Sequence, residues 1–253
     1  MPSRPVLLLA ALALLAAPAC RGTLTVDGYT PGGSDDDDAS GDDDDSVDPN
    51  DMDGDGDPAD TDCDDNDPTA YNGADENCGD GVDNDCDPST LCYEASVGDN
   101  IAFIQPIENT LDAADWYRSA GQGVPPFMNS DNMLIALHRR SGERDLSLVF
   151  VIDAIEDGSG GQAEVIVEGV EGAELLIEDD PGEGFVDDDE AYFFFQWVSC
   201  CVDGAVIGPL EPDLCISIDV NQADNLDGFG VVDREGEQPL GSTNQRLQLC
   251  ATQ

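Results

Sequence analysis

The segment from residue 50 to residue 92 constrains the fold of this chain more than any other part, because it contains almost no apolar side chains. Aspartate recurs at alternate positions among Gly, Asn, Pro and Cys, and fourteen aspartates lie between Asp51 and Asp87. Such a segment cannot offset its loss of backbone entropy by burying apolar surface. We therefore expect residues 50–92 to form a small module that folds around disulfides, bound cations or both.

The first part of this module has the spacing of a calcium-binding loop. From Asp51 to Asp62, carboxylates occupy loop positions 1, 3, 5, 7 and 12, and Gly56 stands at position 6. Calcium prefers many oxygen ligands, and alternate side chains of a tight, glycine-containing loop can converge on one ion. Position 12 is Asp62 rather than the longer Glu, and flanking helical sequence is missing. We therefore predict a structural calcium site rather than a sensor switch.

The acidic pattern continues downstream, where Asp and Asn alternate with cysteines. No basic residue lies in this segment, so its negative charge would repel itself unless cations neutralised it or the chain stayed extended. We predict that calcium is the bound ion, with an acidic disordered segment as the alternative. The predicted metal ligands share side-chain oxygens and are Asp51, Asp53, Asp55, Asp57, Asp62, Asp64, Asp65, Asn66, Asp67, Asp80, Asp83, Asn84, Asp85 and Asp87.

These residues resemble a known family. The run D-x-D-G-D…D-C-D-D-N-D-P…G-A-x-E-x-C-G-D-G-x-D-N-D-C-D, from Asp51 to Asp87, is similar to the MopE-type metal-binding motif of secreted bacterial proteins. Asn72 and Pro88 stand where that family usually has Pro and Gly. The resemblance implies loops held by ions and disulfides rather than catalysis. The family is named after a copper-binding protein, but carboxylate oxygens suit calcium better than copper, so copper scavenging is kept only as an alternative.

The N-terminus has the composition of an export signal. Arg4 supplies positive charge, an apolar run extends from Val6 to Ala17, and Ala19 precedes Cys20. The stretch resembles a bacterial lipoprotein signal, although Ala17 stands where such signals usually carry Leu. We predict a signal peptide over residues 1–19 and a lipid on Cys20 that anchors the protein to a membrane. Ordinary signal peptidase, which would leave Cys20 unmodified, is the alternative.

Residues 20–49 are predicted to form a disordered acidic linker. They are rich in Gly, Ser, Pro and Asp and include the runs Asp35–Asp38 and Asp42–Asp45, so they are too polar and too charged to bury a core. Such a spacer would hold the folded part away from an anchored Cys20. The expected location is the outer membrane or cell surface, or the medium if the lipid is missing.

Cysteine usage also indicates an oxidising compartment. The chain has nine cysteines, and a lipid on Cys20 leaves eight that can pair completely. We expect pairing within each of two groups, and free thiols or metal thiolates are the alternative. Adjacent residues of a strand point to opposite faces, so Cys200 and Cys201 are each predicted to pair with a different partner among Cys215 and Cys250. A disulfide between the two adjacent cysteines is the alternative. The two groups are Cys63, Cys78, Cys86 and Cys92, followed by Cys200, Cys201, Cys215 and Cys250.

Residues 95–253 have the pattern of a β domain. Short apolar runs are separated by Gly, Asp, Asn and Pro, and alternation is clearest at 163–168 and 215–220. One or two helical turns are expected within 109–117. The number and spacing of the runs predict a mainly β fold with a C-terminal antiparallel, jelly-roll-like sandwich. The remaining candidate strands are 100–105, 132–138, 146–152, 173–177, 191–198, 229–232 and 246–250.

Two acidic runs of this domain, Glu178–Glu183 and Asp187–Glu190, lie on either side of Phe185. We interpret them as solvated loops, and a second calcium site is the alternative. The single histidine, His138, precedes two arginines at a predicted strand end, where we expect it to be solvated rather than to act as a catalytic base. The chain is therefore predicted not to be an enzyme.

The charge balance limits the partners. The chain has 57 acidic and 8 basic side chains and a formal charge of -49, which would repel nucleic acid and anionic surfaces. We predict a cell-surface or secreted calcium-binding protein of structural or adhesion type, in which the module presents a β-sandwich that binds an extracellular glycan or protein. The alternatives are an extracellular hydrolase carried by the β domain and a metal scavenger.

Overall fold

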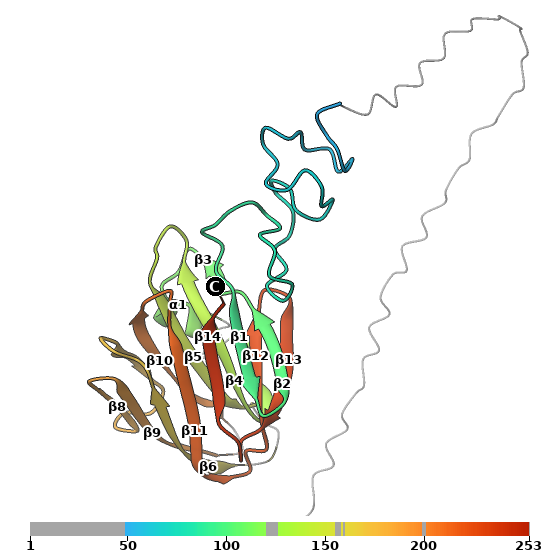
Figure 1. The fold of residues 1–253 in the computed structure, drawn as a ribbon. Helices are drawn as coiled ribbons and strands as arrows, with labels where there is room; N and C mark the ends of the chain where they lie inside the picture. Colours follow the sequence, from blue (N-terminus) through green and yellow to red (C-terminus); the bar gives the residue numbers. More distant parts are fainter. Residues whose placement is uncertain (1–48, 120–125, 155–157, 159, 199–200, 253) are drawn as a thin grey trace, which may run out of the picture. The chain divides into compact units, whose positions relative to one another are not determined.

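The computed structural model describes residues 49–119, 126–154, 158, 160–198 and 201–252 (Figure 1). Residues Val47–Gln253 form one compact unit. The predicted signal peptide, the predicted lipidation site Cys20 and the predicted linker up to residue 48 lie outside the described residues, as does Cys200. Within the described part of the chain, no helix is long and apolar enough to cross a membrane.

The described residues beyond the acidic module form strands and one short helix. The elements are β1 (Tyr93–Val97), β2 (Asn100–Ile104), β3 (Ile107–Asn109), α1 (Ala113–Tyr117), β4 (Asn129–Arg140), β5 (Leu146–Asp153), β6 (Gly161–Glu168), β7 (Glu174–Glu178), β8 (Gly184–Asp187), β9 (Glu190–Trp197), β10 (Asp203–Leu210), β11 (Cys215–Asp224), β12 (Gly228–Asp233), β13 (Gly236–Ser242) and β14 (Leu247–Ala251).

The strands form two sheets that pack face to face (Figure 1). The first sheet has the order β2-β1-β14-β11-β6-β9-β8, and the second has the order β13-β12-β4-β5-β10-β7. The predicted mainly β sandwich is therefore confirmed. Pairing is antiparallel except at β4, which pairs in parallel with β12 along Asn132–Ala136 and with β3 along His138–Arg140. The long β4 strand thus has two short parallel neighbours beside it.

An apolar core lies between the two sheets. Side chains of alternate residues enter it, such as Phe193 and Phe195 of β9 and Phe150 of β5, and all three are buried. Burying one large side chain of this kind contributes roughly 1.5–3 kcal/mol. The aromatic run of β9 is therefore explained by packing, and no ligand groove is needed to account for its inward-facing members.

A second, smaller core covers the other face of the second sheet. It contains Leu134 and Ala136 of β4, Val149 of β5 and Trp116 of α1. Strands β4 and β5 are therefore buried on both faces, which explains why their sequences are continuous apolar runs rather than alternating ones. Asp112 is the N-cap of helix α1, and its side chain accepts a hydrogen bond from the backbone N–H of Asp115.

His138 belongs to this second core, so the expectation that it is solvated is wrong. It is 2 % exposed, and its ring stacks on Trp116 with 4.9 Å between centroids. Burial lowers the pKa of His138 to about 4, so the imidazole is neutral at pH 7. The sequence did not reveal this burial, because the side chain that covers His138 is Trp116 of α1 and not a residue next to it in the chain.

The disulfides of the sandwich also differ from the prediction. Cys215 and Cys250 pair with each other, so the expected pairing of each with Cys200 or Cys201 is wrong. The physical reason is the strand register, because β11 and β14 are antiparallel neighbours in which these two residues stand directly opposite each other. Cys201 is itself disulfide-bonded.

Candidate metal centres

The acidic module begins with a loop that gathers carboxylates. Ligand atoms of Asp51, Asp53 and Asp55 all lie within 4.8 Å of one another, and the three side chains are half-buried while Met52, Gly54 and Gly56 are exposed. Both glycines have a positive φ, at 83° and 102°, a region that L side chains rarely adopt. The alternation of Asp and Gly thus curls the chain with its carboxylates on the inside.

In three carboxylates of this loop, one oxygen accepts a hydrogen bond and the other does not. Oδ1 of Asp53, Asp55 and Asp62 accepts a backbone N–H two residues later, from Asp55 (3.3 Å), Asp57 (2.8 Å) and Asp64 (2.8 Å) respectively. Oδ2 of each is buried and has no hydrogen-bond partner. A buried anionic oxygen without a partner is costly, and a bound cation would remove that penalty.

Electrostatics connect position 12 of the loop to its start. Burial is the largest cause that raises the pKa of Asp53, and the hydrogen bond from the Asp55 N–H partly offsets it. The negative charges of Asp55, Asp62 and Asp51 raise this pKa further. The negative charge of Asp62 therefore reaches the Asp53 carboxyl, as is expected of an oxygen ligand at position 12. Negative charge gathered around the Asp53 carboxyl in this way favours a cation beside it.

Asp57 and Asp65 hold this loop to the next part of the module. Asp57 accepts hydrogen bonds from the Thr61 hydroxyl and, at 3.0 Å, from the backbone N–H of Asn72. Oδ1 of Asp65 accepts the N–H of Met52 at 2.9 Å. Both oxygens of Asp57 are thus engaged, so its side chain has a bracing role, and its backbone carbonyl is the ligand that an EF-hand loop uses at position 7.

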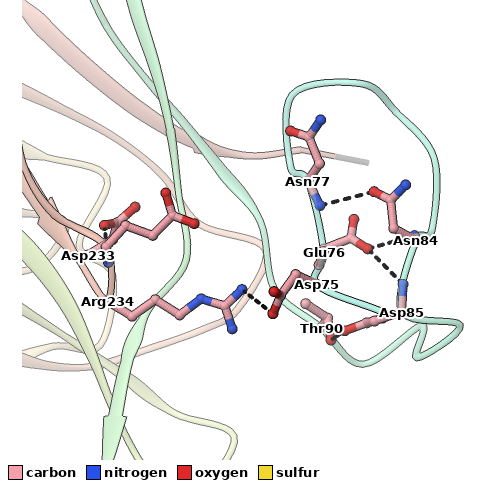
Figure 2. A network of polar contacts seen from close by, with 9 residues as sticks. Asp75, Glu76, Asn77, Asn84, Asp85, Thr90, Asp233 and Arg234 are labelled. Atoms are coloured by element: carbon pink, nitrogen blue, oxygen red, sulfur yellow. Dashed lines mark hydrogen bonds and ion pairs between the residues drawn. The ribbon is translucent and has the colours of Figure 1, made fainter. Parts of the chain in front are cut away.

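A second cluster contains Glu76, Asp83 and Asp85, whose ligand atoms also lie within 4.8 Å of one another. Oε2 of Glu76 accepts the backbone N–H of Asn84 at 2.7 Å and of Asp85 at 3.3 Å, as Figure 2 shows. Asn84 is 3 % exposed, and its amide accepts the N–H of Asn77 and donates to the carbonyl of Thr69. One carboxylate and one amide thus organise this loop.

Glu76 is absent from the set of ligands predicted from the aspartate spacing. The sequence signal for Glu76 is the glutamate of the G-A-x-E-x-C stretch, at Gly73–Cys78, which lies outside the pattern of alternating Asp residues. Its longer side chain reaches across the loop to Asn84, eight residues away, and this is why a glutamate rather than an aspartate stands there.

Several other predicted ligands stabilise turns. Oδ1 of Asp67 accepts from the N–H and hydroxyl of Thr69, and Oδ1 of Asp87 does the same with Ser89. These hydrogen bonds lower the pKa of both carboxyls. Asp80 accepts from the N–H of Val82 and the amide of Asn77.

The remaining predicted ligands lie on the outside of the module. Asp64 and Asn66 are exposed. Of the whole predicted set, the groups with converging ligand atoms contain Asp51, Asp53, Asp55, Asp62, Asp83 and Asp85.

Two disulfides fix the module, and one of them ends directly before the first strand of the sandwich. Cys63 pairs with Cys86, and Cys78 pairs with Cys92, which directly precedes β1. Pairing within the N-terminal group of cysteines is as expected. Asp62 also lies close to Cys63 and Cys86, but a sulfur in a disulfide cannot act as a thiolate ligand.

Residues of the module also contact the sandwich. Arg234, which follows β12, forms an ion pair with Asp75 at 3.6 Å (Figure 2). Gly79 lies against Phe103 of β2, where an added Cβ would stand 3.0 Å from the ring.

The donor set fits a hard cation rather than copper. Both clusters offer carboxylate oxygens, the four cysteines of the module are oxidised, and His138 is enclosed in the second core. Copper prefers imidazole, thiolate or thioether ligands, whereas calcium prefers carboxylate and carbonyl oxygens.

The fold and the clusters define a β-sandwich protein that carries a disulfide-stapled, aspartate-rich metal-binding module. Comparison with known families agrees: the family model Cu-binding_MopE, described as "Putative metal-binding motif", matches residues 62–90. The chain therefore carries the MopE-type motif, although the match begins at Asp62 and leaves the loop from Asp51 outside it. No curated protein and no solved structure matches the chain.

Proposed function

We propose that this chain is an exported, calcium-binding structural protein of adhesion type, in which calcium orders the acidic module and the module presents the β-sandwich to an extracellular glycan or protein. The observation that carries the calcium assignment is the set of buried, unpartnered Oδ2 atoms on Asp53, Asp55 and Asp62. Hydrogen bonds hold the other oxygen of each carboxylate, so the free oxygens are available to a cation.

Calcium is favoured over copper by ligand chemistry. The second cluster joins Glu76 with Asp83 and Asp85, so both groups offer oxygen alone. We expect affinities on the order of 10⁻⁴ to 10⁻³ M, as is typical of extracellular calcium modules. A copper-scavenging function would instead need imidazole or sulfur ligands at the surface of the module.

The proposed location follows from the disulfides and the N-terminal sequence. Three disulfides among the described cysteines indicate an oxidising, extracytoplasmic environment. We further propose that residues 1–19 are removed as a signal peptide and that Cys20 carries the lipid. Mass spectrometry of the N-terminal peptide from exported protein tests this point, because a diacylglyceryl or triacyl mass on Cys20 supports anchoring and an unmodified thiol contradicts it.

We propose a binding role rather than catalysis for the sandwich. A hydrolase would need two accessible carboxyls, and the pair with raised pKa values in this domain, Glu183 and Asp203, includes a residue that is only 2 % exposed. Both oxygens of Asp203 accept backbone N–H groups, so this carboxyl is not available to a substrate.

Limited proteolysis of the intact, oxidised chain tests the proposed function. With calcium present, we expect cleavage between Asn50 and Cys92 to slow markedly relative to EDTA, whereas cleavage within the sandwich strands should change little. Magnesium at the same concentration is the control for non-specific charge screening. Equal cleavage of the module with calcium and with EDTA would contradict the proposal.

A further inference from the structure

Strands β8 and β9 form one end of the first sheet (Figure 1), and aromatic side chains gather there on the outer face. Alternate residues of β9 enter the main core, so Tyr192 and Phe194 lie on the opposite face of the strand. Phe185 of β8 stands opposite Tyr192 in the register, and their rings stack with 5.6 Å between centroids. These three residues form the aromatic patch.

The aromatic patch is open to solvent. Phe185 is 57 % exposed and Phe194 is 39 % exposed, so packing in the main core does not account for these two rings. The outer face of the second sheet is different, because α1 covers it with Trp116 and Tyr117. Exposed apolar side chains that lie next to one another mark an interaction surface.

Carboxylates lie around the aromatic patch. Glu164 of β6 stands opposite Phe194 and accepts a hydrogen bond from the Tyr192 hydroxyl. Asp187 and Glu190 stand opposite each other at the turn between β8 and β9, and both are exposed. Each of them is two residues away from a ring of the patch and so shares its face. None of the three carboxylates belongs to an ion pair among the described residues.

A positive side chain lies further along the same face, but two carboxylates already share it. Arg246 forms an ion pair with Glu168 at 3.1 Å and a second one with Asp219. One guanidinium thus balances two negative charges, so the face around the patch keeps a negative charge. Aromatic rings beside such carboxylates suit a cationic side chain, because the face of a ring and the negative charges both attract it.

We propose that the aromatic patch binds a basic polypeptide segment, with arginine or lysine side chains on the exposed rings and facing the surrounding carboxylates. The assignment rests on the proposed binding role of the sandwich, and it makes the partner a protein. A single contact of this kind is weak at an exposed site, so several positive side chains of one segment act together. Charge disfavours two other occupants, because a second copy of the chain, with its formal charge of -49, and an anionic glycan would both be repelled.

Binding of a defined peptide to the intact, oxidised chain tests this surface. The probe is a fluorescein-labelled peptide in which arginine alternates with serine, and fluorescence anisotropy measures its dissociation constant in calcium at about 150 mM salt. The whole chain attracts cations, so the comparison uses variants that leave its charge unchanged. We expect Phe185→Ala to weaken peptide binding about fivefold, and the double variant with Phe194→Ala to weaken it more than about tenfold.

Matched variants show what the rings contribute. Phe185→Leu keeps an apolar side chain without an aromatic face, so it should bind the peptide as weakly as Phe185→Ala, whereas Phe185→Tyr should keep wild-type affinity. Ile101, on β2 at the opposite edge of the same sheet, is 56 % exposed. Ile101→Ala therefore removes a similarly exposed apolar side chain far along the sheet, and it should leave peptide binding unchanged.

The carboxylates are tested in the same way. Glu190→Gln should weaken peptide binding about twofold, as expected for one exposed charge beside the patch. Glu235→Gln removes the same charge from the turn between β12 and β13 in the second sheet, where Glu235 is also exposed. Its affinity for the peptide should stay near that of the wild type.

Three results would overturn the proposal. Two of them are equal peptide affinity in Phe185→Ala and the wild type, and full affinity in Phe185→Leu, which would leave no role for an aromatic face. The third is a neutral oligosaccharide such as cellohexaose that binds the wild type but not Phe185→Ala, while peptide binding is the same in both. This third result would uphold the proposed binding role of the sandwich with a glycan as the partner. Calcium protection of the module without any binding at the patch would uphold the calcium assignment and reject this surface.

Discussion

Glu76 and Asn84 form the central link of the second acidic loop, with Oε2 of Glu76 accepting the backbone N–H of Asn84 at 2.7 Å (Figure 2). Because the acceptor is charged, its loss should cost about 1.5–3 kcal/mol. We expect Glu76→Ala to destabilise the module and to weaken calcium binding, as measured by calorimetric titration and by proteolysis near Asp85.

Glu76→Gln separates the two roles of this side chain. It retains an oxygen that can accept from Asn84 but lacks the negative charge, so the loop should stay protected from protease while the calcium affinity falls. If Glu76→Gln and the wild type bound calcium equally, Glu76 would be a structural residue only.

The first loop allows a matched comparison between an inward and an outward aspartate. Asp53→Asn should reduce calcium affinity by at least about tenfold, equivalent to about 1.4 kcal/mol, because Oδ2 of Asp53 is one of the buried oxygens without a partner. Asp60→Asn changes the same charge in the same loop, but Asp60 is exposed. Calorimetry should therefore give near wild-type affinity for Asp60→Asn, and equal losses in the two variants would indicate non-specific charge attraction.

Much of this architecture could be predicted from the sequence, because each strand with a regular apolar pattern was recognisable. Strands β1, β3, β8, β10 and β13 were missed. The first three are short, β10 contains Gly204, Gly208 and Pro209, and β13 contains Pro239 and Gly241, which weaken a strand pattern. The parallel pairing of β4 with β12 depends on contacts between distant segments, which local periodicity does not encode. The two-sheet sandwich, by contrast, follows from the number and spacing of the short apolar runs.

The sites were partly predictable for the same reason. Asp51, Asp53 and Asp55 are close in sequence, so their convergence could be read from spacing. Local pattern does not relate Glu183, which precedes β8, to Asp203, which begins β10, and it makes the acidic run containing Glu183 look solvated. Nothing near Asp203 in the sequence distinguished it from a turn residue.

His138 gives the sandwich a dependence on acid pH. Burial depresses its folded-state pKa to about 4, below the ordinary value of 6.5. The stability contributed by the neutral ring is therefore complete above pH 6.5 and is lost as the pH falls through the window from about 6.5 to 4. Relative to wild type, His138→Phe should gain up to about 3 kcal/mol in unfolding free energy between pH 7 and pH 4.

Urea unfolding at pH 7 and at pH 4 measures this gain in unfolding free energy. Phenylalanine is chosen because its ring can keep the stacking on Trp116. Parallel pH profiles for wild type and His138→Phe would mean that the imidazole is solvated and titrates normally.

The pair of Glu183 and Asp203 predicts the opposite slope at higher pH. Its folded-state pKa values are raised, so the stability it contributes is complete below the unfolded values near 4 and is lost as the pH rises towards about 8. In EDTA, the difference in stability between Glu183→Gln and wild type should therefore grow in favour of the variant from pH 5 to pH 8.5. After allowance for solvent screening at Glu183, we expect about 1–2 kcal/mol.

Thermal unfolding in EDTA, followed by circular dichroism, measures this difference. A difference that did not change with pH would show that the pKa of Glu183 is not raised in the folded protein.

The central claim is that calcium orders the acidic module. The most direct test is calorimetric titration of calcium into the intact, oxidised, metal-stripped chain, combined with hydrogen exchange of residues 50–92. We predict saturable binding on the order of 10⁻⁴ to 10⁻³ M, with amide exchange of the loop from Asp51 to Asp62 slowing as the sites fill. Absence of saturable binding, with the same rapid exchange of residues 50–92 before and after calcium addition, would contradict the claim and leave the segment as an acidic spacer held by its two disulfides.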